Sequence, residues 1–253
     1  MAVWILDLDG VVWLAEDVIP GVPEAVARLR EGGHTIVFPT NNSSRKVGDL
    51  VQKFEGMGID VEADEIVTSA QAAASMLEPG STALVCAGDG VREALDARGV
   101  KWVNEGEADT VVVGFHKEFD YGRLNAAYQA VRAGARLVGT NDDVTYPTPD
   151  GPIPGGGSLL AAVAAAAGVE AEVAGKPYQP MADAILDRLG GGVEAGGLVV
   201  GDRPDTDGLL AKRLGLPFAL VFSGVTKEDD LPVDPEPVKT APDLPTLVDQ
   251  ELA

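Results

Sequence analysis

The chain has 253 residues, 45% of them hydrophobic, which is enough for one large core or two modest domains. Its 40 acidic and 19 basic residues give a formal net charge of −21 at pH 7. This charge excludes most nonspecific nucleic-acid binders and argues equally against binding to an anionic membrane surface, because both need a basic face. The acidic residues are spread along the chain without a block of like charges. That spread favours a surface adapted to high salt over a docking face for a cationic partner.

The cysteine content and the lengths of the apolar runs exclude further classes of protein. The single cysteine, Cys86, excludes an internal disulfide, and together with only two histidines it excludes a structural zinc site. This composition fits a reducing cytoplasm. No apolar run reaches membrane-spanning length, and the Ala-rich residues 159–169 predict a buried helix instead.

The N-terminal part of the chain alternates short apolar runs with amphipathic segments. Residues 3–6 form an apolar strand pattern, and a helix is predicted from about Pro23 to Gly32. Residues 35–38 predict a second strand, and apolar residues at helical spacing over 47–54 predict a second helix.

The same alternation continues through the middle of the chain. Strands are predicted at 82–85, 110–113 and 136–138, with a helix over 124–131. The roughly one hundred residues from 70 to 172 are enough for a domain of their own.

The C-terminal part returns to strands at 198–200 and 218–222, followed by a Pro- and Asp-rich stretch over 229–245 that we expect to be an extended surface segment. Repeated strand–helix alternation with β-branched strands predicts an α/β fold, a doubly wound, Rossmann-like parallel sheet covered on both faces.

Polar residues collect directly after the predicted strands. In open α/β sheets ligands bind beyond the carboxyl ends of the strands, so we expect these residues to converge at one sheet edge. They are Asp7, Asp9, Thr40, Asn41, Asp202, Asp205 and Asp207, with Lys176 after a short strand-like segment.

This mixture of side chains suits phosphate chemistry. Carboxylates brought together need a cation or must share a proton, and Mg²⁺ is the hard, oxygen-liganded cation that fits. A lysine and a threonine hydroxyl can hydrogen-bond phosphate oxygens. An aspartate can serve as the nucleophile and form an aspartyl-phosphate.

Four ordered motifs resemble those of the haloacid dehalogenase superfamily: Asp7-Leu8-Asp9-Gly10-Val11, Thr40-Asn41-Asn42-Ser43-Ser44, Gly175-Lys176-Pro177 and Gly201-Asp202-Arg203-Pro204-Asp205-Thr206-Asp207. The middle of the chain is similar to the large α/β cap of the NagD-like branch, through segments 112–115, 134–141 and 153–157. The resemblance implies a discontinuous core over 1–69 and 173–253, with a substrate-selecting cap over 70–172.

The resemblance also implies roles for the acidic residues. Asp7 is expected to be the nucleophile and a Mg²⁺ ligand, and Asp9 the general acid and base, with its backbone carbonyl on the metal. Asp202 is expected to be a further Mg²⁺ ligand, and Asp207 to orient the metal-bound waters.

The remaining site residues follow from the same resemblance. Thr40 and Asn41 are expected to hold the transferring phosphoryl group, and Lys176 to bridge the nucleophile and the phosphate charge. In the cap, Asn141, Asp142 and His116 are candidate contacts to the leaving group, although a histidine in such a loop is more often a surface residue.

The presence of Asp9 favours a phosphatase over a dehalogenase, because a phosphatase needs an acid to protonate the leaving alkoxide. We expect a Mg²⁺-dependent hydrolase of small phosphorylated metabolites such as a sugar phosphate, glycerol phosphate or phosphoglycolate. A phosphotransferase and a non-catalytic phosphate-ligand binding or regulatory protein are the alternatives. The resemblance also allows a homodimer through the cap.

Overall fold

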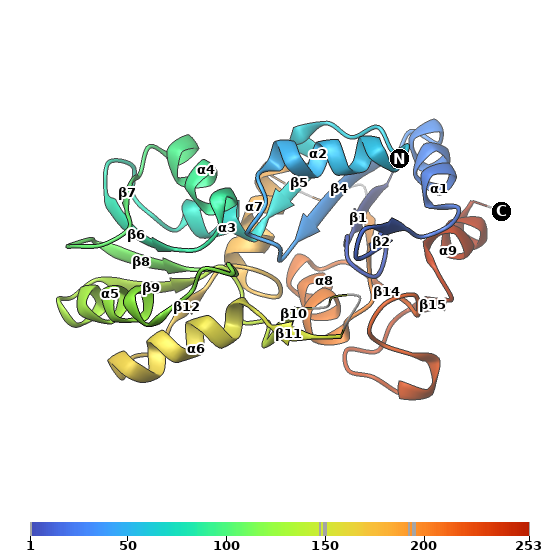
Figure 1. The fold of residues 1–253 in the computed structure, drawn as a ribbon. Coiled ribbons are helices and arrows are strands. Elements are labelled where there is room, and N and C mark those ends of the chain that lie inside the picture. The colour runs from blue at the N-terminus through green and yellow to red at the C-terminus, as the bar shows by residue number, and fades with distance from the viewer. Residues whose placement is uncertain (1, 147, 149–150, 192, 194–195, 253) are drawn as a thin grey trace. The chain divides into compact units, whose positions relative to one another are not determined.

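The computed structural model describes residues 2–146, 148, 151–191, 193 and 196–252. The chain divides into two compact units (Figure 1). The first comprises Met1–Thr40, Gly48–Val67 and Ile185–Ala253, and the second comprises Asn41–Val47 and Thr68–Ala184. Each unit has its own sheet, which confirms the predicted α/β class with a second α/β unit.

The first unit is built on a six-stranded parallel sheet in the order β15-β14-β13-β1-β4-β5. Successive strands are added outward in both directions from the central pair β1 and β13, so the sheet is doubly wound as predicted. Its strands are β1 (Val3–Leu6), β4 (Thr35–Thr40), β5 (Ile66–Thr68), β13 (Gly197–Gly201), β14 (Phe218–Val221) and β15 (Lys239–Ala241).

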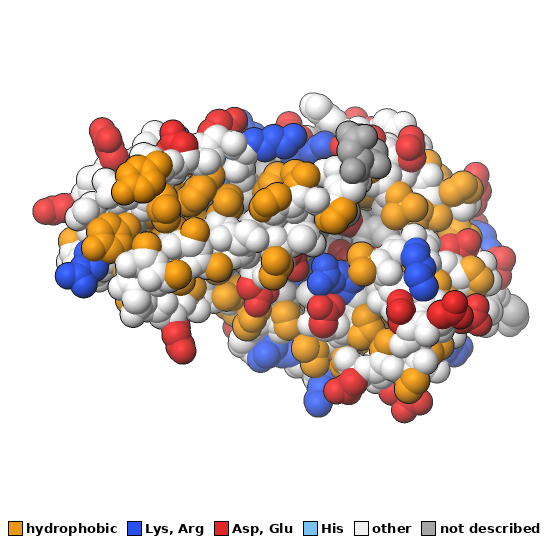
Figure 2. Space-filling model, turned by 60° about the horizontal axis from the view of Figure 1, so that its bottom comes forward, with side chains coloured by type: hydrophobic (Ala, Val, Ile, Leu, Met, Phe, Trp, Pro, Cys, Tyr) orange, Lys and Arg blue, Asp and Glu red, His pale blue; other side chains and the backbone are white. Residues whose placement is uncertain are grey.

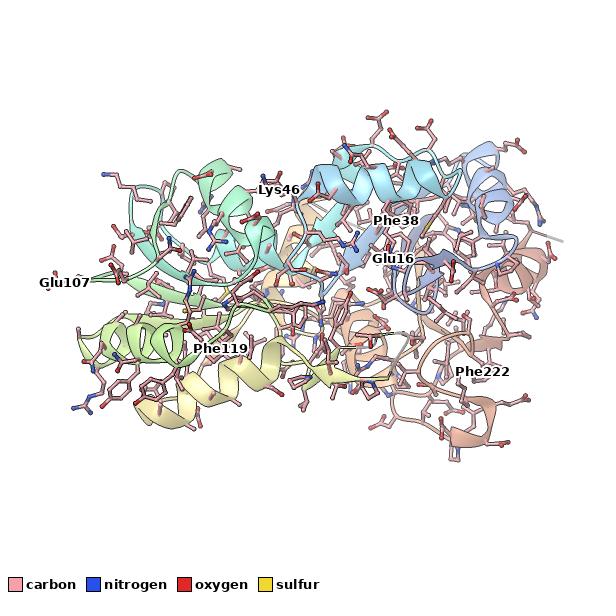
Figure 3. All side chains as sticks on the ribbon, viewed as in Figure 1. Glu16, Phe38, Lys46, Glu107, Phe119 and Phe222 are labelled. Carbon is pink, nitrogen blue, oxygen red and sulfur yellow. The ribbon has the colours of Figure 1, made fainter. Side chains whose placement is uncertain are left out.

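This sheet is apolar because helices cover it. All four residues of β1 are buried, as expected for a parallel strand packed on both faces. The helices are α1 (Val22–Glu31), α2 (Val47–Gly56), α8 (Leu209–Leu214) and α9 (Leu244–Glu251). The apolar face of α1 packs on β4 and on α9. Phe38 of β4 (Figure 3) lies 4.9 Å from Phe54 of α2, between ring centroids.

The second unit has a five-stranded parallel sheet in the order β12-β9-β8-β6-β7. Helices α5 and α6 pack against each other and against this sheet, while α3 packs on α4 (Figure 1). The strands are β6 (Thr82–Cys86), β7 (Lys101–Val103), β8 (Thr110–Val113), β9 (Arg136–Gly139) and β12 (Glu172–Val173). The helices are α3 (Ser69–Ser75), α4 (Asp89–Arg98), α5 (Tyr121–Arg132) and α6 (Gly156–Ala167), and α7 (Gln179–Arg188) leads back into the first unit.

Two short hairpins and three single turns of helix complete the described structure. In the first unit, β2 (Trp13–Leu14) pairs with β3 (Asp17–Val18) directly after the first motif. In the second unit, β10 (Thr145–Tyr146) pairs with β11 (Ile153–Pro154). The turns are 3₁₀ at Ala63–Glu65 and Glu228–Asp230, and π-helical at Pro204–Gly208.

Three expectations from the sequence are wrong. The Ala-rich helix α6 buries Leu160 and Val163 but exposes alanines at 161, 165 and 166, because it covers only one face of the sheet. Segment 229–245 is not simply extended surface, since it contains the edge strand β15 and the start of α9. The strand before Lys176, β12, pairs with β9 in the second sheet and does not join the core sheet.

None of the helices in the described part of the chain combines the length and the apolar character needed to cross a membrane.

Candidate active site

A buried acidic cluster lies at the carboxyl edge of the first sheet. Asp7 follows β1 and Asp202 follows β13, and these strands are neighbours in register, with Leu6 beside Val200. One carboxylate oxygen from each of Asp7, Asp202 and Asp207 lies within 4.8 Å of the others. The three residues are only 7%, 2% and 1% exposed. The cluster therefore sits where the strand order reverses, the usual ligand position of a doubly wound sheet.

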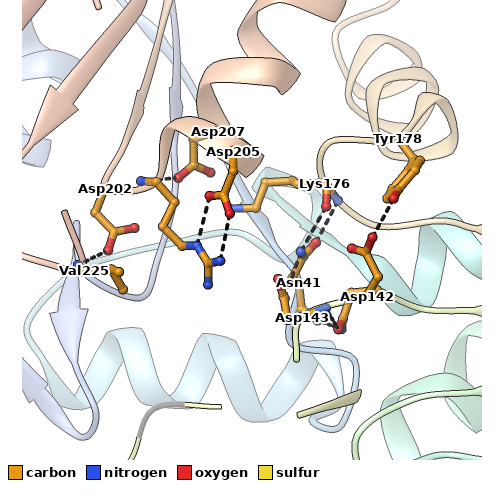
Figure 4. Close-up of polar contacts among 11 residues, drawn as sticks. Asn41, Asp142, Asp143, Lys176, Tyr178, Asp202, Asp205, Asp207 and Val225 are labelled. Atoms are coloured by element: carbon orange, nitrogen blue, oxygen red, sulfur yellow. Dashed lines mark hydrogen bonds and ion pairs between the residues drawn. The ribbon is translucent and has the colours of Figure 1, made fainter. Parts of the chain in front are cut away.

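Backbone amides fix these carboxylates in place. The Leu8 amide donates to Asp7 Oδ1 at 2.7 Å, and the Val225 amide donates to Asp202 Oδ2 at 2.5 Å. The Arg203 amide donates to Asp207 Oδ2 at 3.2 Å (Figure 4). The π-helical turn at Pro204–Gly208 carries Asp207 back toward its own strand, a local geometry often found at functional sites.

Three glycines make room for the acidic side chains. A Cβ on Gly224 would lie 1.9 Å from Asp202 Oδ2, and a Cβ on Gly10 would lie 2.5 Å from the same atom. Gly10 also has a φ of +88°, which disfavours other residues. A Cβ on Gly201 would lie 2.2 Å from Asp207. Gly10 and Gly201 stand in the sequence motifs, whereas no motif singles out Gly224.

The cluster has the donor set of a hard divalent cation. Three carboxylates buried this close together repel one another unless a cation or a shared proton offsets their charge. Mg²⁺ and Ca²⁺ are bound by oxygen ligands, carboxylates among them. The chemistry of the donors therefore fits a divalent metal ion.

Asp9 and Thr40 belong to the same unit as this cluster. Asp9 is half-buried, and its Oδ1 accepts a hydrogen bond from Trp13 Nε1 at 3.0 Å. Thr40 is 1% exposed and ends β4, the strand that pairs with β1 on the side away from β13. Thr40 therefore ends a strand at the same sheet edge as Asp7.

Asn41 and Lys176 lie together in the second unit. Asn41 Oδ1 accepts from the Lys176 amide at 2.7 Å, and Asn41 Nδ2 donates to the Lys176 carbonyl at 3.2 Å (Figure 4). The same Nδ2 donates to Asp143 Oδ2 at 3.0 Å. The Asn41 carbonyl accepts from Asn141 Nδ2 at 2.7 Å. Lys176 itself is 3% exposed.

The three candidate cap contacts differ in their surroundings. Asn141 is buried and its amide donates to the Asn41 carbonyl, so its nitrogen has a structural partner. Asp142 is exposed and accepts from the Tyr178 hydroxyl at 2.5 Å. His116 is not the surface residue that such a loop predicts, because it is only 8% exposed, with Nδ1 3.0 Å from the Gly114 carbonyl oxygen. Burial lowers the pKa of His116.

The fold and the acidic cluster agree with a family model. Residues 4–101 match a model described as haloacid dehalogenase-like hydrolase, and residues 173–247 match a second HAD-hydrolase-like model. An acid sugar phosphatase of Staphylococcus epidermidis is 32% identical over 232 residues, which cover 90% of this chain and 89% of that protein. This chain belongs to the haloacid dehalogenase-like hydrolases. The resemblance seen in the four sequence motifs is thereby confirmed.

Solved structures of the same family share the complete fold. A p-nitrophenyl phosphatase from Archaeoglobus fulgidus superposes with a TM-score of 0.90 at 31% identity, over 98% of each chain. A glycerol phosphate phosphatase from Mycobacterium tuberculosis, in complex with magnesium, has a TM-score of 0.89 at 32% identity. This match covers 97% of the present chain and 75% of the mycobacterial one.

Proposed function

We propose that this hydrolase is a Mg²⁺-dependent phosphatase of small phosphate monoesters and that it works through an aspartyl-phosphate on Asp7. The buried cluster of Asp7, Asp202 and Asp207 at the carboxyl edge of the first sheet carries this proposal. Family relatives named acid sugar phosphatase and glycerol phosphate phosphatase support the same substrate class.

The metal would be held by the carboxylates of Asp7 and Asp202 and by the backbone carbonyl of Asp9, with Asp207 orienting its waters. When bound, Mg²⁺ neutralises the clustered carboxylates and the phosphate oxygens. The three-carboxylate donor set fits this ion, and the magnesium complex of the mycobacterial relative agrees with it.

The chain's own residues carry the two chemical steps. Asp7 attacks phosphorus while the bond from phosphorus to the ester oxygen breaks, and Asp9 gives its proton to the departing alkoxide, so an alcohol leaves. Asp9, now ionised, takes a proton from water as the water oxygen attacks the phosphorus of the aspartyl-phosphate. Inorganic phosphate leaves and the Asp7 carboxylate is regenerated.

Phosphate binding is assigned to Thr40, Asn41 and Lys176. The Lys176 ammonium supplies a positive charge for the transferring phosphoryl oxygens and the nucleophile, and the Thr40 hydroxyl supplies a neutral hydrogen bond. The Asn41 side-chain amide bonds to both backbone polar groups of Lys176 and to Asp143, so it contributes by holding Lys176 in position.

We assign residues 1–69 and 173–253 to the catalytic core and 70–172 to a cap that selects the leaving group. His116 and Asp142 in this cap are the leading candidates for leaving-group contacts. A homodimer through the cap is compatible with the exposed apolar side chains of Tyr121 and Val169. Sedimentation equilibrium of the wild type and of Tyr121→Lys would test it, since a monomeric wild type refutes the dimer.

A cytoplasmic location and adaptation to high salt are also proposals. Cys86 is buried and free, which suits a reducing compartment. Acidic side chains are scattered over the face shown in Figure 2, among fewer Lys and Arg. At molar salt the screening length is about 3 Å, so repulsion among these charges fades. Folding stability and substrate affinity are expected to hold or rise as NaCl approaches about 1 M. A steep loss of both would refute the adaptation to high salt.

The deciding experiment measures phosphate release from p-nitrophenyl phosphate with Mg²⁺, with and without a chelator. The wild type is expected to turn over the ester, the chelator to stop it, and Asp7→Asn to abolish it. Full activity of Asp7→Asn would overturn the nucleophile assignment. Product analysis with added glycerol as acceptor separates hydrolysis from phosphotransfer. If the wild type turns over no ester, the alternative of a non-catalytic phosphate-binding protein is favoured.

A further inference from the structure

We propose that Trp13 is a positioning residue for Asp9, and that Lys53 holds Trp13 in place to do this. The inference rests on the proposed function, in which Asp9 donates a proton to the leaving oxygen. It adds to that function a device for aiming the acid, built from the β2–β3 hairpin and helix α2.

The hydrogen bond between Trp13 and Asp9 has ordinary length and is supported by the local backbone. Trp13 Nε1 donates to Asp9 Oδ1 at 3.0 Å, and Trp13 is only 2% exposed. The loop between them is closed by its own backbone, because the Gly10 amide donates to the Trp13 carbonyl at 2.7 Å. The Leu8 carbonyl in turn accepts from the Trp13 amide at 3.2 Å. The loop therefore brings the indole N–H and the carboxylate close to each other.

Two neighbouring residues of α2, Lys53 and Phe54, contact the indole ring. The Phe54 ring meets it edge-on, with centroids 4.9 Å apart. Lys53 Nζ lies 4.2 Å from the indole centroid, within the range of a cation–π contact. The Lys53 side chain is only 11% exposed, so this contact is largely shielded from water.

Lys53 also ties the tip of the hairpin to α2. Its Nζ donates to the Ala15 carbonyl at 2.6 Å and lies 3.7 Å from a carboxylate oxygen of Glu16. Ala15 has a φ of 54°, the left-handed conformation that turns the chain back into β3. The hairpin, the indole and α2 thus form one rigid support behind Asp9.

This support has a chemical consequence. A carboxyl group that transfers a proton must present one oxygen to the leaving group, and free rotation would spread its two oxygens over many directions. The indole N–H holds Oδ1, which restricts the rotation of the carboxyl group and favours one orientation of the acid. A correctly placed general acid contributes about 10²–10⁴-fold to a reaction that needs the proton.

The test compares esters that differ in their need for an acid. An alkoxide must be protonated to leave, whereas p-nitrophenolate leaves without a proton. The alkyl ester in this test is glycerol phosphate or glucose 6-phosphate, whichever the wild type hydrolyses faster. We expect Trp13→Phe to lower kcat/KM for that ester about tenfold or more. For p-nitrophenyl phosphate the loss should be at least several-fold smaller. Because kcat/KM reports only steps up to loss of the alcohol, slow hydrolysis of the aspartyl-phosphate does not mask the difference.

Three further variants make the result specific. Trp102→Phe is the matched control, because Trp102 Nε1 donates in the same way to a carboxylate, Asp96 Oδ1 at 2.9 Å, in the second unit. Its ratio of kcat/KM for the alkyl ester to kcat/KM for p-nitrophenyl phosphate should equal that of the wild type. Lys53→Met should shift the ratio in the same direction as Trp13→Phe, and it replaces that variant should Trp13→Phe fail to fold. In an Asp9→Asn background, Trp13→Phe should not change the ratio further.

The outcomes separate this inference from the function on which it rests. If Trp13→Phe and Lys53→Met both leave the ratio of the two kcat/KM values as in the wild type, whether or not activity falls, the positioning role is overturned. The proposed phosphatase function would be unaffected by that result. A wild type that hydrolyses neither ester, or an Asp7→Asn variant that hydrolyses both, would instead refute the proposed function.

Discussion

The side-chain amide of Asn41 is bonded to both backbone polar groups of Lys176, 135 residues further along the chain. Its oxygen accepts from the Lys176 amide and its nitrogen donates to the Lys176 carbonyl. A Cβ on the preceding Gly175 would lie 2.5 Å from the same Asn41 oxygen. The backbone position of Lys176 is therefore set by an asparagine amide and by the absence of a side chain on the preceding residue.

Asn41→Asp is expected to disrupt this arrangement. The new oxygen would face the Lys176 carbonyl and the Asp143 carboxylate, two acceptors, so a buried donor is replaced by repulsion. We expect a loss of about 1–3 kcal/mol in the free energy of unfolding and a marked fall in kcat. Urea unfolding and steady-state kinetics measure the two effects.

Two variants make that comparison sharp. Asn42→Asp is the control, because the Asn42 side-chain oxygen accepts from the Ser44 amide at 3.0 Å and from the Ser44 hydroxyl at 2.8 Å, and a carboxylate oxygen can accept both bonds. It should be close to neutral. Adding Asp143→Asn to Asn41→Asp restores a donor between these side chains and should recover part of the stability. No loss in Asn41→Asp would contradict the holding role of this amide.

Gly224→Ala is expected to damage the acidic cluster. Its Cβ would lie 1.9 Å from Asp202 Oδ2, so the carboxylate or the loop of Val225 must move. A displacement of about 1 Å at a catalytic group can cost about 10²-fold, and kcat/KM with p-nitrophenyl phosphate is the measurement. Gly48→Ala on α2 is the control, since nothing lies within 4 Å of its Cβ. It should stabilise the helix by about 0.5–1 kcal/mol. Equal activities of the two variants would show that the close approach is unimportant.

Asp207→Asn should have opposite effects on stability with and without metal. In the absence of Mg²⁺ it removes one of three neighbouring negative charges, so the free energy of unfolding should rise by about 1–3 kcal/mol. With saturating Mg²⁺ the wild type should gain more stability than the variant, because the ion binds the full cluster more tightly. Thermal unfolding across a Mg²⁺ titration measures both.

Asp205→Asn is the control for this experiment. Asp205 lies on the same turn, but its side chain is 68% exposed and pairs with Arg203 at 3.1 Å. A surface pair of this kind contributes about 0–1 kcal/mol, so Mg²⁺ should stabilise this variant as it does the wild type. An identical Mg²⁺ response in Asp207→Asn would argue against a role for Asp207 near the metal.

Cys86 predicts a loss of stability at alkaline pH. Burial raises the pKa of its thiol from the ordinary 9.0 to about 11. Above the ordinary value the unfolded chain ionises while the folded chain does not, so stability is complete below pH 9 and falls between pH 9 and about 11. The slope from this one group is about 1.4 kcal/mol per pH unit. Cys86→Ala should flatten that part of the pH profile in urea unfolding, and an unchanged slope would contradict the burial argument.

The parts of the fold with continuous apolar or amphipathic patterns were predictable from the sequence. Residues 3–6 are apolar without a break and form β1, and the helix predicted after Pro23 is α1. Lys239–Ala241 carries no such pattern and becomes a strand only because β14 offers an open edge. The strand β15 therefore forms through its pairing with β14, which the local sequence does not encode.

The candidate site also has a part that the sequence predicts and a part that it does not. Asp7 and Asp202 could be placed together because parallel neighbouring strands end at one edge. Holding contacts such as Asn41 to Lys176 and Lys53 to Trp13 could not be predicted, since they depend on how separate segments meet. His116 shows the limit of residue statistics, because a histidine in a loop after a strand is buried here against Phe119.

The central strand pair of the first sheet also bears on how the protein is made. Val3 of β1 pairs with Gly197 of β13, so the middle of this sheet joins two segments that lie on either side of the second unit in the sequence. Apart from Asn41–Val47, the second unit is one continuous stretch, Thr68–Ala184. On a ribosome the inserted unit can complete its sheet while β1 has only β4 beside it, so the β13 side of apolar β1 stays unpaired until later residues emerge. Asp202 can therefore join Asp7, the proposed nucleophile, only after the whole second unit has been synthesised.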